Sequence, residues 1–592
     1  MIYQSFDYET TGLKPYHGDR MFAYCIGDEQ GEVEVKRVDG KNSKKNWERL
    51  QDFFDDISIG KVAHNLKFEL SLGDVHNINT PEETVFHDTM IMSRILRSDT
   101  PSHKLDDLCR RYCGDDSLTK EWDEIDTEVD RIFKVTESYQ KIPKYLMHKY
   151  QVADGQRCML LFQLFLPALL KDPDLYETCK VEIETIKTTQ RLESHGIRFS
   201  PYHAEKLISW MEKELDKIQH EIKSEIGEYI NLNSDKEVVR ILFNKLEMPV
   251  LKFTDNKNPA IDKDVIFYLQ KSNPHPILDC ILRQRSYVKG ISIIKGYIKS
   301  CRKTKSGIYI IHPNINTNHA LTGRMTSSNP NLQNVSKRKG LKNPYPVPAR
   351  QCYIPRPHCI LFMVDYDGIE MRIAVQCSGS KRLIKLLYEN FDFHKACAES
   401  FFGKRFTDEK DPEIKAMLRS AAKNGRFAML YGGGIQTVAN TMLLSVKEAK
   451  YGKDRDRERF PEFYDLMDDC SAMAREQGYI ETLFGRKLYV PRHKSYIATD
   501  YRIQGTAAEV FKRGEVAVEN FLIQYYSDIR LLVPVHDELM GEMPRHHLKN
   551  KLEIMREISN KLTNIERITV PLTVGWKLST TTWDGAKEVK ID

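Results

Sequence analysis

The sequence predicts an α+β protein of several domains, led by an α/β domain. The chain has 592 residues, which is too long for one hydrophobic core and corresponds to roughly four domains of about 150 residues each. A short strand ends at Asp7, and helical patterns then alternate with short apolar runs as far as residues 167–174, as is typical of an α/β domain. Two further apolar strand patterns, at 360–364 and around 536–538, lie on either side of a long helical stretch.

Composition and charge narrow the class of protein. The chain is 41% hydrophobic and 29% charged, with a net charge of +5, which predicts packed cores, a soluble protein and a mild basic bias. This bias permits a nucleic-acid partner but does not identify one. The twelve cysteines include no CxxC pair, so reduced and mostly buried thiols are expected.

The opening residues and the apolar stretches give no sign of export or of a membrane anchor. The start, MIYQSFDYET, has neither a basic leader nor an apolar run, so no signal peptide is predicted. The most apolar stretch, residues 158–170, is shorter than the roughly 20 residues that a membrane span needs. A cytoplasmic protein without a membrane partner is therefore expected.

From about Ala204 the sequence predicts one long amphipathic helix. Apolar side chains recur there at steps of three and four residues along a highly charged segment, which is the spacing of one helix face. A coiled coil would have this pattern, but the stripe lasts fewer than about four heptads and stops at the loop-like residues 231–234. A helical arm that folds back on the same chain is therefore favoured. The stripe consists of Ile208, Met211, Leu215, Ile218, Ile222 and Ile226.

Two apolar strand patterns place acidic residues at their ends. ILFMVDYDGIEMR puts Asp365 at the end of one strand, and RLLVPVHDELMGE puts Asp537 and Glu538 between two apolar runs, as a tight hairpin would. A pair of divalent ions about 3.5 to 4 Å apart needs carboxylates held side by side on rigid elements. Taken alone, each segment is better explained as an ordinary turn or cap. The helix between the two segments makes a metal site the favoured interpretation.

That helix has the pattern of a nucleotide site. In RSAAKNGRFAMLYGGG, the residues Arg419, Lys423, Phe427 and Tyr431 recur every fourth residue, so each step turns only about 40° and all four share one face. Two cations followed by two aromatics suit a nucleoside triphosphate, with its phosphates on the cations and its base or sugar against the rings. The glycines at 432–434 are interpreted as a helix C-cap rather than as a phosphate-binding loop.

Six separated motifs then follow one another in a familiar order. They are LTGRMTSSNPNLQN, VDYDGIEMR, the Arg-Lys-Phe-Tyr helix with its terminal YG, GYIETLFGRKLYVP, QGTAAEVFKRG and VHDE. Together they resemble the family A DNA polymerases, the bacterial DNA polymerase I type and its bacteriophage relatives. The resemblance implies templated extension of a primer, with primer-template DNA and dNTPs as partners. It does not identify any replisome protein as a partner.

The resemblance also implies two Mg²⁺ ions per active site, with Mn²⁺ as an alternative. Asp365 and Asp537 would be the principal metal ligands, with Glu538 as a supporting carboxylate and the Tyr366 carbonyl as a further ligand. Relatives usually have a small or polar uncharged residue where this chain has Asp367. In an extended strand Asp367 would share a face with Asp365, and we expect it to turn away.

Five positions match residues that bind the incoming nucleotide in the family. Arg419 and Lys423 would grip the triphosphate, and Phe427 would contact the sugar. His394, in DFHKACAESFFG, matches a helix position that faces the nucleotide. Glu370 would block a ribose 2′-hydroxyl, which implies selection of deoxyribonucleotides.

Four further positions match residues that contact the template or the primer. Tyr431 would guard the template position beside the new base pair. Arg324 and Gln504 would read the minor groove of primer and template, and His536 would lie close to the primer terminus. Asp500 stands where many relatives have an amide that contacts the template, so the resemblance does not carry that contact over.

The first segment contains a second group of acidic residues. Asp7 and Glu9 share one face of a strand by its period of two, and Tyr150 and Asp154 lie one helical turn apart. FDYETTGL, AHNLKFEL and YQVAD resemble the three blocks of the DEDD-type 3′-5′ exonucleases, in the subclass that carries a tyrosine. The metal ligands implied are Asp7, Glu9, Asp154 and Glu69, where Glu69 replaces the aspartate of the family, while Tyr150 would orient an activated water.

The resemblance implies an α+β polymerase right hand of palm, fingers and thumb, preceded by an α/β ribonuclease H-like exonuclease domain. No 5′-nuclease domain is recognised, which favours a bacteriophage replicative enzyme that acts in the host cytoplasm. The expected parts are the exonuclease at 1–173, the thumb with the palm entry at 174–305, the first part of the palm at 306–380, the fingers at 381–500 and the second part of the palm at 501–592.

Two other functions are compatible with parts of this pattern. A single-subunit RNA polymerase shares the metal aspartates and the Arg-Lys-Tyr helix, but Glu370 and the attached exonuclease argue against it. A DNA-binding subunit with inactive sites is a second alternative. Every predicted metal-binding side chain is still acidic, so an active enzyme is favoured.

Overall fold

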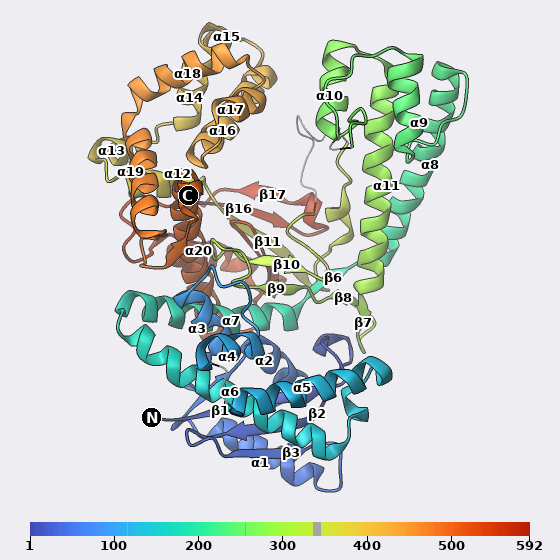
Figure 1. The fold of residues 1–592 in the computed structure, drawn as a ribbon. Helices are drawn as coiled ribbons and strands as arrows, with labels where there is room; N and C mark the ends of the chain where they lie inside the picture. The colour runs from blue at the N-terminus through green and yellow to red at the C-terminus, as the bar shows by residue number, and fades with distance from the viewer. Residues whose placement is uncertain (115–116, 255, 336–344, 592) are drawn as a thin grey trace.

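The computed structural model describes residues 1–114, 117–254, 256–335 and 345–591. Figure 1 shows an N-terminal domain at the bottom and, above it, a central sheet from which two helical arms rise. No helix in the described ranges has an apolar stretch long enough to cross a membrane. All twelve cysteines are free thiols and most are buried, as the sequence predicts.

The N-terminal domain is built on a five-stranded mixed sheet in the order β3-β2-β1-β4-β5. β4 runs parallel to the central β1 and β5 runs parallel to β4, whereas β2 and β3 are antiparallel to their neighbours. The strands are β1 (Ile2–Thr10), β2 (Met21–Gly27), β3 (Val33–Arg37), β4 (Ile59–Ala63) and β5 (Phe86–Asp88). The helices are α1 (Ser43–Asp55), α2 (Leu66–Val75), α3 (Thr89–Leu96), α4 (Leu105–Cys113), α5 (Ser117–Thr136) and α6 (Lys144–Leu170).

The alternation along β1 sets up the site of this domain. Phe6 and Tyr8 are buried in the apolar core under the sheet, so the intervening Asp7 and Glu9 point to the opposite face. That face is crossed by α6, which packs on β1. The sequence therefore forms a core with one face of the strand and presents carboxylates on the other.

The first helical arm confirms the predicted amphipathic helix. α8 (Pro201–Ile226) begins with Ser200, whose hydroxyl accepts a hydrogen bond from the His203 amide at 3.3 Å, as an N-cap should. Its apolar stripe is buried against α11 (Pro276–Ser300). The arm thus folds back on the same chain, as expected. Its remaining helices are α9 (Asp235–Val239), the π-helix η3 (Arg240–Lys245) and α10 (Lys263–Ser272).

Helix α7 (Pro173–His195) links the N-terminal domain to the rest of the chain. Its first half contributes Leu175, Cys179 and Ile183 to the N-terminal core, and it also packs on α20 (Ala498–Tyr525). The first helical arm begins only after this helix. α7 therefore belongs to the boundary rather than to the arm.

The second helical arm contains the predicted nucleotide helix. α16 (Pro412–Leu430) ends where Gly432, at φ +80°, donates its amide to the Met429 carbonyl at 2.9 Å. This left-handed glycine stops the helix, so the C-cap interpretation is confirmed. The other helices are α12 (Ile369–Ser378) at its base, α13 (Lys381–Tyr388), α14 (Phe393–Phe402), α15 (Lys404–Thr407), α17 (Ile435–Met442), α18 (Val446–Arg459) and α19 (Pro461–Gln477).

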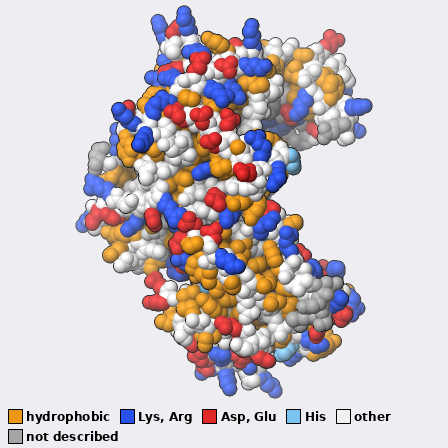
Figure 2. Space-filling model, turned by 60° about the vertical axis from the view of Figure 1, so that its left-hand side comes forward, with side chains coloured by type: hydrophobic (Ala, Val, Ile, Leu, Met, Phe, Trp, Pro, Cys, Tyr) orange, Lys and Arg blue, Asp and Glu red, His pale blue; other side chains and the backbone are white. Residues whose placement is uncertain are grey.

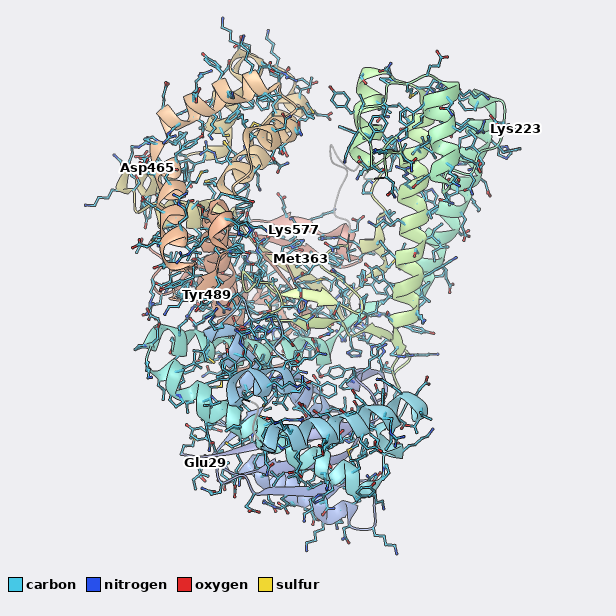
Figure 3. All side chains as sticks on the ribbon, in the orientation of Figure 1. Glu29, Lys223, Met363, Asp465, Tyr489 and Lys577 are labelled. Atoms are coloured by element: carbon cyan, nitrogen blue, oxygen red, sulfur yellow. The ribbon has the colours of Figure 1, made fainter. Side chains whose placement is uncertain are left out.

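The central sheet lies between the arms and has the order β14-β15-β11-β16-β17. Met363 on β11 and Lys577 on β16 pair in register and mark this sheet in Figure 3. α20 and α21 (Lys551–Thr563) pack together beside it. Its strands are β11 (Cys359–Tyr366), β14 (Arg530–Val535), β15 (Glu538–Pro544), β16 (Val574–Ser579) and β17 (Lys587–Val589).

Short elements complete the chain. Small sheets are formed by β6 (Ile197–Phe199), β7 (Arg302–Lys303) and β8 (Tyr309–Ile311), by β9 (Asn314–Asn316) and β10 (Thr326–Ser328), and by β12 (Tyr479–Glu481) and β13 (Lys487–Tyr489). Short 3₁₀ helices are η1 (Pro15–His17), η2 (Tyr139–Lys141), η4 (Ala349–Cys352), η5 (Arg492–Ile497), η6 (Arg545–Lys549) and η7 (Trp583–Gly585).

Polar contacts fasten the N-terminal domain to the central region. The Lys67 ammonium of α2 donates to Glu193 at 2.6 Å, to the Asn314 side chain at 2.5 Å and to the Ile315 carbonyl at 2.6 Å. At a second point Arg97 lies over the ring of Tyr489, 4.4 Å from its centroid. Figure 3 shows Tyr489 just above the N-terminal domain.

The surface has no large area of one charge on the face seen in Figure 2, where Lys and Arg side chains alternate with Asp and Glu from top to bottom. This mixture agrees with the small net charge of +5. Charge alone therefore does not locate a nucleic-acid groove on this face.

Candidate active sites

The central sheet brings three predicted carboxylates to one edge. Asp365 near the end of β11 pairs in register with Glu538, the first residue of β15. His536 and Asp537 form the two-residue loop between β14 and β15, and His536 has φ +59°, as such tight hairpins require. The Tyr366 amide donates to the Asp537 carbonyl at 3.3 Å. Asp365 and Glu538 are thus paired on neighbouring strands, and Asp537 lies beside them in the hairpin loop.

Asp367, the aspartate that relatives usually lack, lies outside strand β11. β11 ends at Tyr366 and Asp367 is exposed. The Asp367 amide donates to the Thr573 carbonyl at 2.9 Å, and Gly368 follows at φ +64°. The period-two alternation that would place Asp367 beside Asp365 does not continue this far.

Helix α16 carries Arg419, Lys423 and Phe427, and Tyr431 follows as its C-cap. The rings of Phe427 and Tyr431 stack at 5.6 Å, and His394 of α14 lies 5.6 Å from Phe427. Burial, and then the charges of Lys423 and Arg419, lower the pKa of His394 to about 3, so this imidazole is neutral. The helix register inferred from the sequence is the one observed.

Arg419 forms an ion pair with the carboxylate of Asp392 in this structure. Its guanidinium donates two hydrogen bonds to Asp392, at 2.7 and 3.0 Å. Asp392 is also the N-cap of α14 and accepts from the amides of His394 and Lys395. This ion pair escaped the sequence analysis, because 27 residues separate its partners.

Tyr431 lies next to a cluster of charged residues. Arg324 and Glu370 form an ion pair, and burial followed by the charge of Glu370 raises the pKa of the Tyr431 hydroxyl. Burial also raises the pKa of Asp500 to about 6, against the opposing charge of Arg324 and a hydrogen bond from Gln504. Five residues singled out from separate motifs therefore meet here.

A small cavity lies between this cluster and the strand ends and hairpin loop that carry Asp365, Asp537 and Glu538. It has a volume of about 40 Å³, and Arg324, His536 and Asp537 line it together with Lys512 of α20. Lys512 itself is buried, and it donates to Glu182 and to the Thr317 carbonyl, the latter at 2.7 Å. The motif search did not single out Lys512, although it lies inside QGTAAEVFKRG.

The N-terminal domain holds the second carboxylate group. Oxygens of Asp7, Glu9 and Asp154 all lie within 4.8 Å of one another. Burial and the neighbouring charges raise the pKa of Asp7 and of Glu9, and burial raises that of Asp154 to about 6. The charge of Asp154, and then burial, raise the pKa of Tyr150. This crowding of acids is unfavourable unless cations neutralise it.

Glu69 lines the same cavity as this group and is not a surface residue. It is buried on α2, and burial followed by the charges of Asp7 and Glu9 raises its pKa. The Oε2 atom of Glu69 and the Oε1 atom of Glu9 are buried without a hydrogen-bond partner among the described residues. Hard oxygen donors left in this way fit Mg²⁺ or a similar cation.

The cavity at this site is shared between two regions of the chain. Its volume is about 960 Å³, and its lining combines Asp7, Glu69 and Tyr150 with residues 316–319 and Leu321, from the end of β9 and the segment after it. The Lys67 contacts described above hold β9 against α2, the helix that carries Glu69. Sequence motifs did not indicate that the region after residue 306 reaches this cavity.

Comparison with known proteins then assigns the family. A family model described as DNA polymerase family A matches residues 202–585, well over half of the chain. The chain belongs to DNA polymerase family A. A second model, described as 3′-5′ exonuclease, matches residues 3–163. The two carboxylate groups fall one in each matched region.

Relatives of this family A chain include two bacterial DNA polymerases I. That of Pseudomonas aeruginosa is 27% identical over 544 residues, which is 89% of this chain and 56% of the relative. That of Caldicellulosiruptor bescii is 28% identical over 531 residues, which is 88% of this chain and 57% of the relative. The chain thus spans little more than half the length of these relatives.

A solved structure confirms the expected fold. It is the POL domain of Pol1 from M. smegmatis in complex with DNA primer-template and dNTP, with a TM-score of 0.81 and 23% sequence identity. The similarity covers 99% of this chain and 96% of the other. The family A polymerase fold is therefore present, preceded by the N-terminal domain with its mixed sheet.

Two buried arginines of this family A chain were missed by motif reasoning. Arg350 stacks on Trp583 at 4.0 Å and lies 3.8 Å from Glu538. Arg157 donates to Asp154 at 2.9 Å and to Asp126 of α5 at 2.7 and 3.1 Å. Each holds a carboxylate of a site in place, and each is recognisable only once distant elements pack.

Replacing Arg157 with Met is expected to destabilise the N-terminal domain by about 3 to 5 kcal/mol, because the buried Asp154 and the partly buried Asp126 lose their common counter-charge. Hydrogen exchange of the β1 amides would measure the loss. Arg131→Met is the matched control, since Arg131 is an exposed residue of α5 whose pair with Glu128 is open to solvent and adds little. Equal exchange rates in the two variants would contradict the prediction.

Proposed function

We propose that this chain is a DNA-templated DNA polymerase that extends a primer from dNTPs and removes mismatched 3′ ends with its own exonuclease. The observation that carries the proposal is the register of β11 with β15, which sets Asp365 opposite Glu538 and beside the loop of Asp537. A second, separate carboxylate group at Asp7, Glu9 and Asp154 supports the exonuclease.

We infer that each site binds a pair of Mg²⁺ ions. Asp365, Asp537 and the Tyr366 carbonyl would hold them in the polymerase site, with Glu538 in support. The exonuclease ions would be held by a second ligand set, Asp7, Glu9, Glu69 and Asp154. Such ions activate an attacking oxygen and stabilise the leaving one.

The chain's own side chains would position the nucleotide. Arg419 and Lys423 would bind the triphosphate, so that Arg419 exchanges the carboxylate of Asp392 for a phosphate. Phe427 would contact the sugar, and neutral His394 would face the nucleotide without adding charge.

The primer and the template would lie against the other end of this face. Tyr431 would stand beside the new base pair, and Arg324 and Gln504 would read the minor groove. His536, on the loop that carries Asp537, would lie near the primer terminus. In the exonuclease site, Tyr150 would orient the attacking water beside Asp154.

The division into parts is likewise a proposal. We assign the exonuclease to 1–173, the thumb with palm entry to 174–305, the palm to 306–380 and 501–592, and the fingers to 381–500. A bacteriophage replicative role in the host cytoplasm stays a prediction, because the relatives compared are bacterial enzymes.

One assay tests both activities. A labelled primer-template is incubated with Mg²⁺, with and without dNTPs, and the products are resolved by length. Extension with dNTPs and shortening without them are the expected results. Preferential use of ribonucleotides would favour the single-subunit RNA polymerase, and failure of both reactions would favour an inactive DNA-binding subunit.

Replacing Glu370 with Ala is expected to raise the ribo- to deoxynucleotide efficiency ratio by roughly tenfold or more, since a shorter side chain leaves room for the 2′-hydroxyl. Glu370 also pairs with Arg324, so total activity is expected to fall. Glu370→Gln is the matched control, because it keeps the length and loses the charge. A ratio that rises equally in both variants would assign the effect to the ion pair instead.

A further inference from the structure

A cluster of two histidines and one aspartate lies outside both carboxylate sites. Asp528 precedes β14, and His546 and His547 follow β15 on η6. The His546 Nε2 atom is 3.0 Å from Asp528 Oδ2, and the His547 Nε2 atom is 2.8 Å from Asp528 Oδ1. All three ligand atoms lie within 4.8 Å of one another. Two imidazole nitrogens and one carboxylate are therefore close enough together to bind one ion.

Packing fixes the orientation of this cluster. The rings of His547 and of Tyr526, the C-cap of α20, meet in a T-shaped contact with centroids 5.5 Å apart. The two histidine rings lie 4.1 Å apart. The His547 side chain is only 15% exposed, whereas that of His546 is 68% exposed. One imidazole is thus anchored, while the other borders solvent from which an ion can enter.

We propose that Asp528, His546 and His547 bind one divalent ion of the zinc class. Imidazole nitrogen favours Zn²⁺, Co²⁺, Ni²⁺ and Cu²⁺ over Mg²⁺. Ligand bonds of about 2.0 to 2.2 Å in a tetrahedron place donors about 3.4 Å apart. The nitrogen-to-oxygen distances of 2.8 and 3.0 Å reach that spacing with small side-chain rotations. Three protein donors leave the fourth position to water.

The place of this site in the fold defines its role. β14 and β15 form one hairpin, whose loop carries His536 and Asp537. The Asp528 cluster joins the two open ends of the same hairpin, a strand length or roughly 20 Å from that loop. A bound ion takes no part in chemistry at Asp537. It fastens the base of the hairpin that carries the catalytic carboxylate.

Cobalt absorption tests the proposal. Metal-free full-length protein is titrated with Co²⁺ in excess Mg²⁺, which occupies the carboxylate sites, and the visible d–d band is recorded. The wild type is expected to give one equivalent of a band that Zn²⁺ displaces. Asp528→Asn and His547→Gln are expected to weaken Co²⁺ binding at least tenfold. His220→Gln, which removes an exposed histidine of α8, is the matched control and is expected to bind normally.

The outcomes separate the proposal from a hydrogen-bonded cluster without metal. Absence of a band in the wild type, or an unchanged band in Asp528→Asn, would overturn it. Melting temperatures of the metal-free variants check folding. Should His547→Gln unfold, His546→Gln removes the exposed ligand instead, and retention of full affinity there would also overturn the proposal. Zn²⁺ is further expected to raise the melting temperature of the wild type and not that of Asp528→Asn.

Discussion

Asp365→Ala and Asp537→Ala are each expected to reduce primer extension by roughly a thousandfold or more, because each removes a proposed ligand of ions that stabilise charge in the transition state by several kcal/mol. Degradation of single-stranded DNA should continue at the wild-type rate. The residues proposed for the second activity, Asp7, Glu9 and Asp154, lie in a different domain. Single-nucleotide insertion and exonuclease rates, measured on the same preparations, would show the contrast.

Asp367→Ala is the comparison variant for this experiment. Asp367 is exposed and follows the end of β11, so its loss is expected to reduce extension by less than about tenfold. A folded Asp365→Ala protein that loses both activities would contradict the assignment of two separate sites. An inactive Asp367→Ala would place a fourth carboxylate in the polymerase site, beside Asp365, Asp537 and Glu538.

Asp7→Ala is expected to abolish the exonuclease to a similar extent and to leave extension intact. Asp7 lies at the centre of its group, within reach of Glu9 and Asp154 and close enough to raise the pKa of Glu69. Glu69→Ala should also lose most of its activity, with part of it restored at high Mg²⁺. The reason is that Mg²⁺ tolerates little change in its oxygen ligands, while the remaining carboxylates still hold the site. Removal of a mismatched primer end over a Mg²⁺ titration measures both effects.

Glu69→Asp shortens the side chain by one methylene and keeps its charge. In the same titration it therefore separates the effect of side-chain length from that of charge. It restores the aspartate that the exonuclease family carries at this position. We expect it to bind Mg²⁺ no more tightly than the wild type, because the surrounding backbone already accommodates the longer side chain. Wild-type activity in Glu69→Ala would exclude Glu69 as a ligand, and a wild type as inactive as Asp7→Ala would end the proofreading proposal.

Sequence reasoning succeeded where a site depends on the period of a single element. Asp7 and Glu9 share a strand face, and Phe427 and Tyr431 stack at 5.6 Å on one helix face, because these spacings follow from backbone geometry alone. The β14–β15 hairpin was predictable as well, since two apolar runs flank its loop. The order of the six motifs indicated which of these elements belong to one site. The periodicity of a single element cannot give that information.

Contacts between distant elements could not be predicted in this way. Arg157 meets Asp126 across 31 residues, and Arg419 meets Asp392 across 27. Such pairs form only when helices pack, and an arginine in a helix pattern is most often a solvated residue. The lining of the exonuclease cavity by residues 316–319 was missed for the same reason.

The cavity lined by both the N-terminal domain and residues 316–319 affects whether the exonuclease domain could be transferred to another polymerase. Lys67 grips Glu193, Asn314 and the Ile315 carbonyl, and the residues that follow β9 complete the cavity wall. A segment such as 1–173, cut out or fused to a foreign polymerase, would keep its carboxylates and lose one side of its groove. If the proposed proofreading activity holds, its groove is formed jointly by the N-terminal domain and the region after β9, and an exchanged exonuclease would need both surfaces.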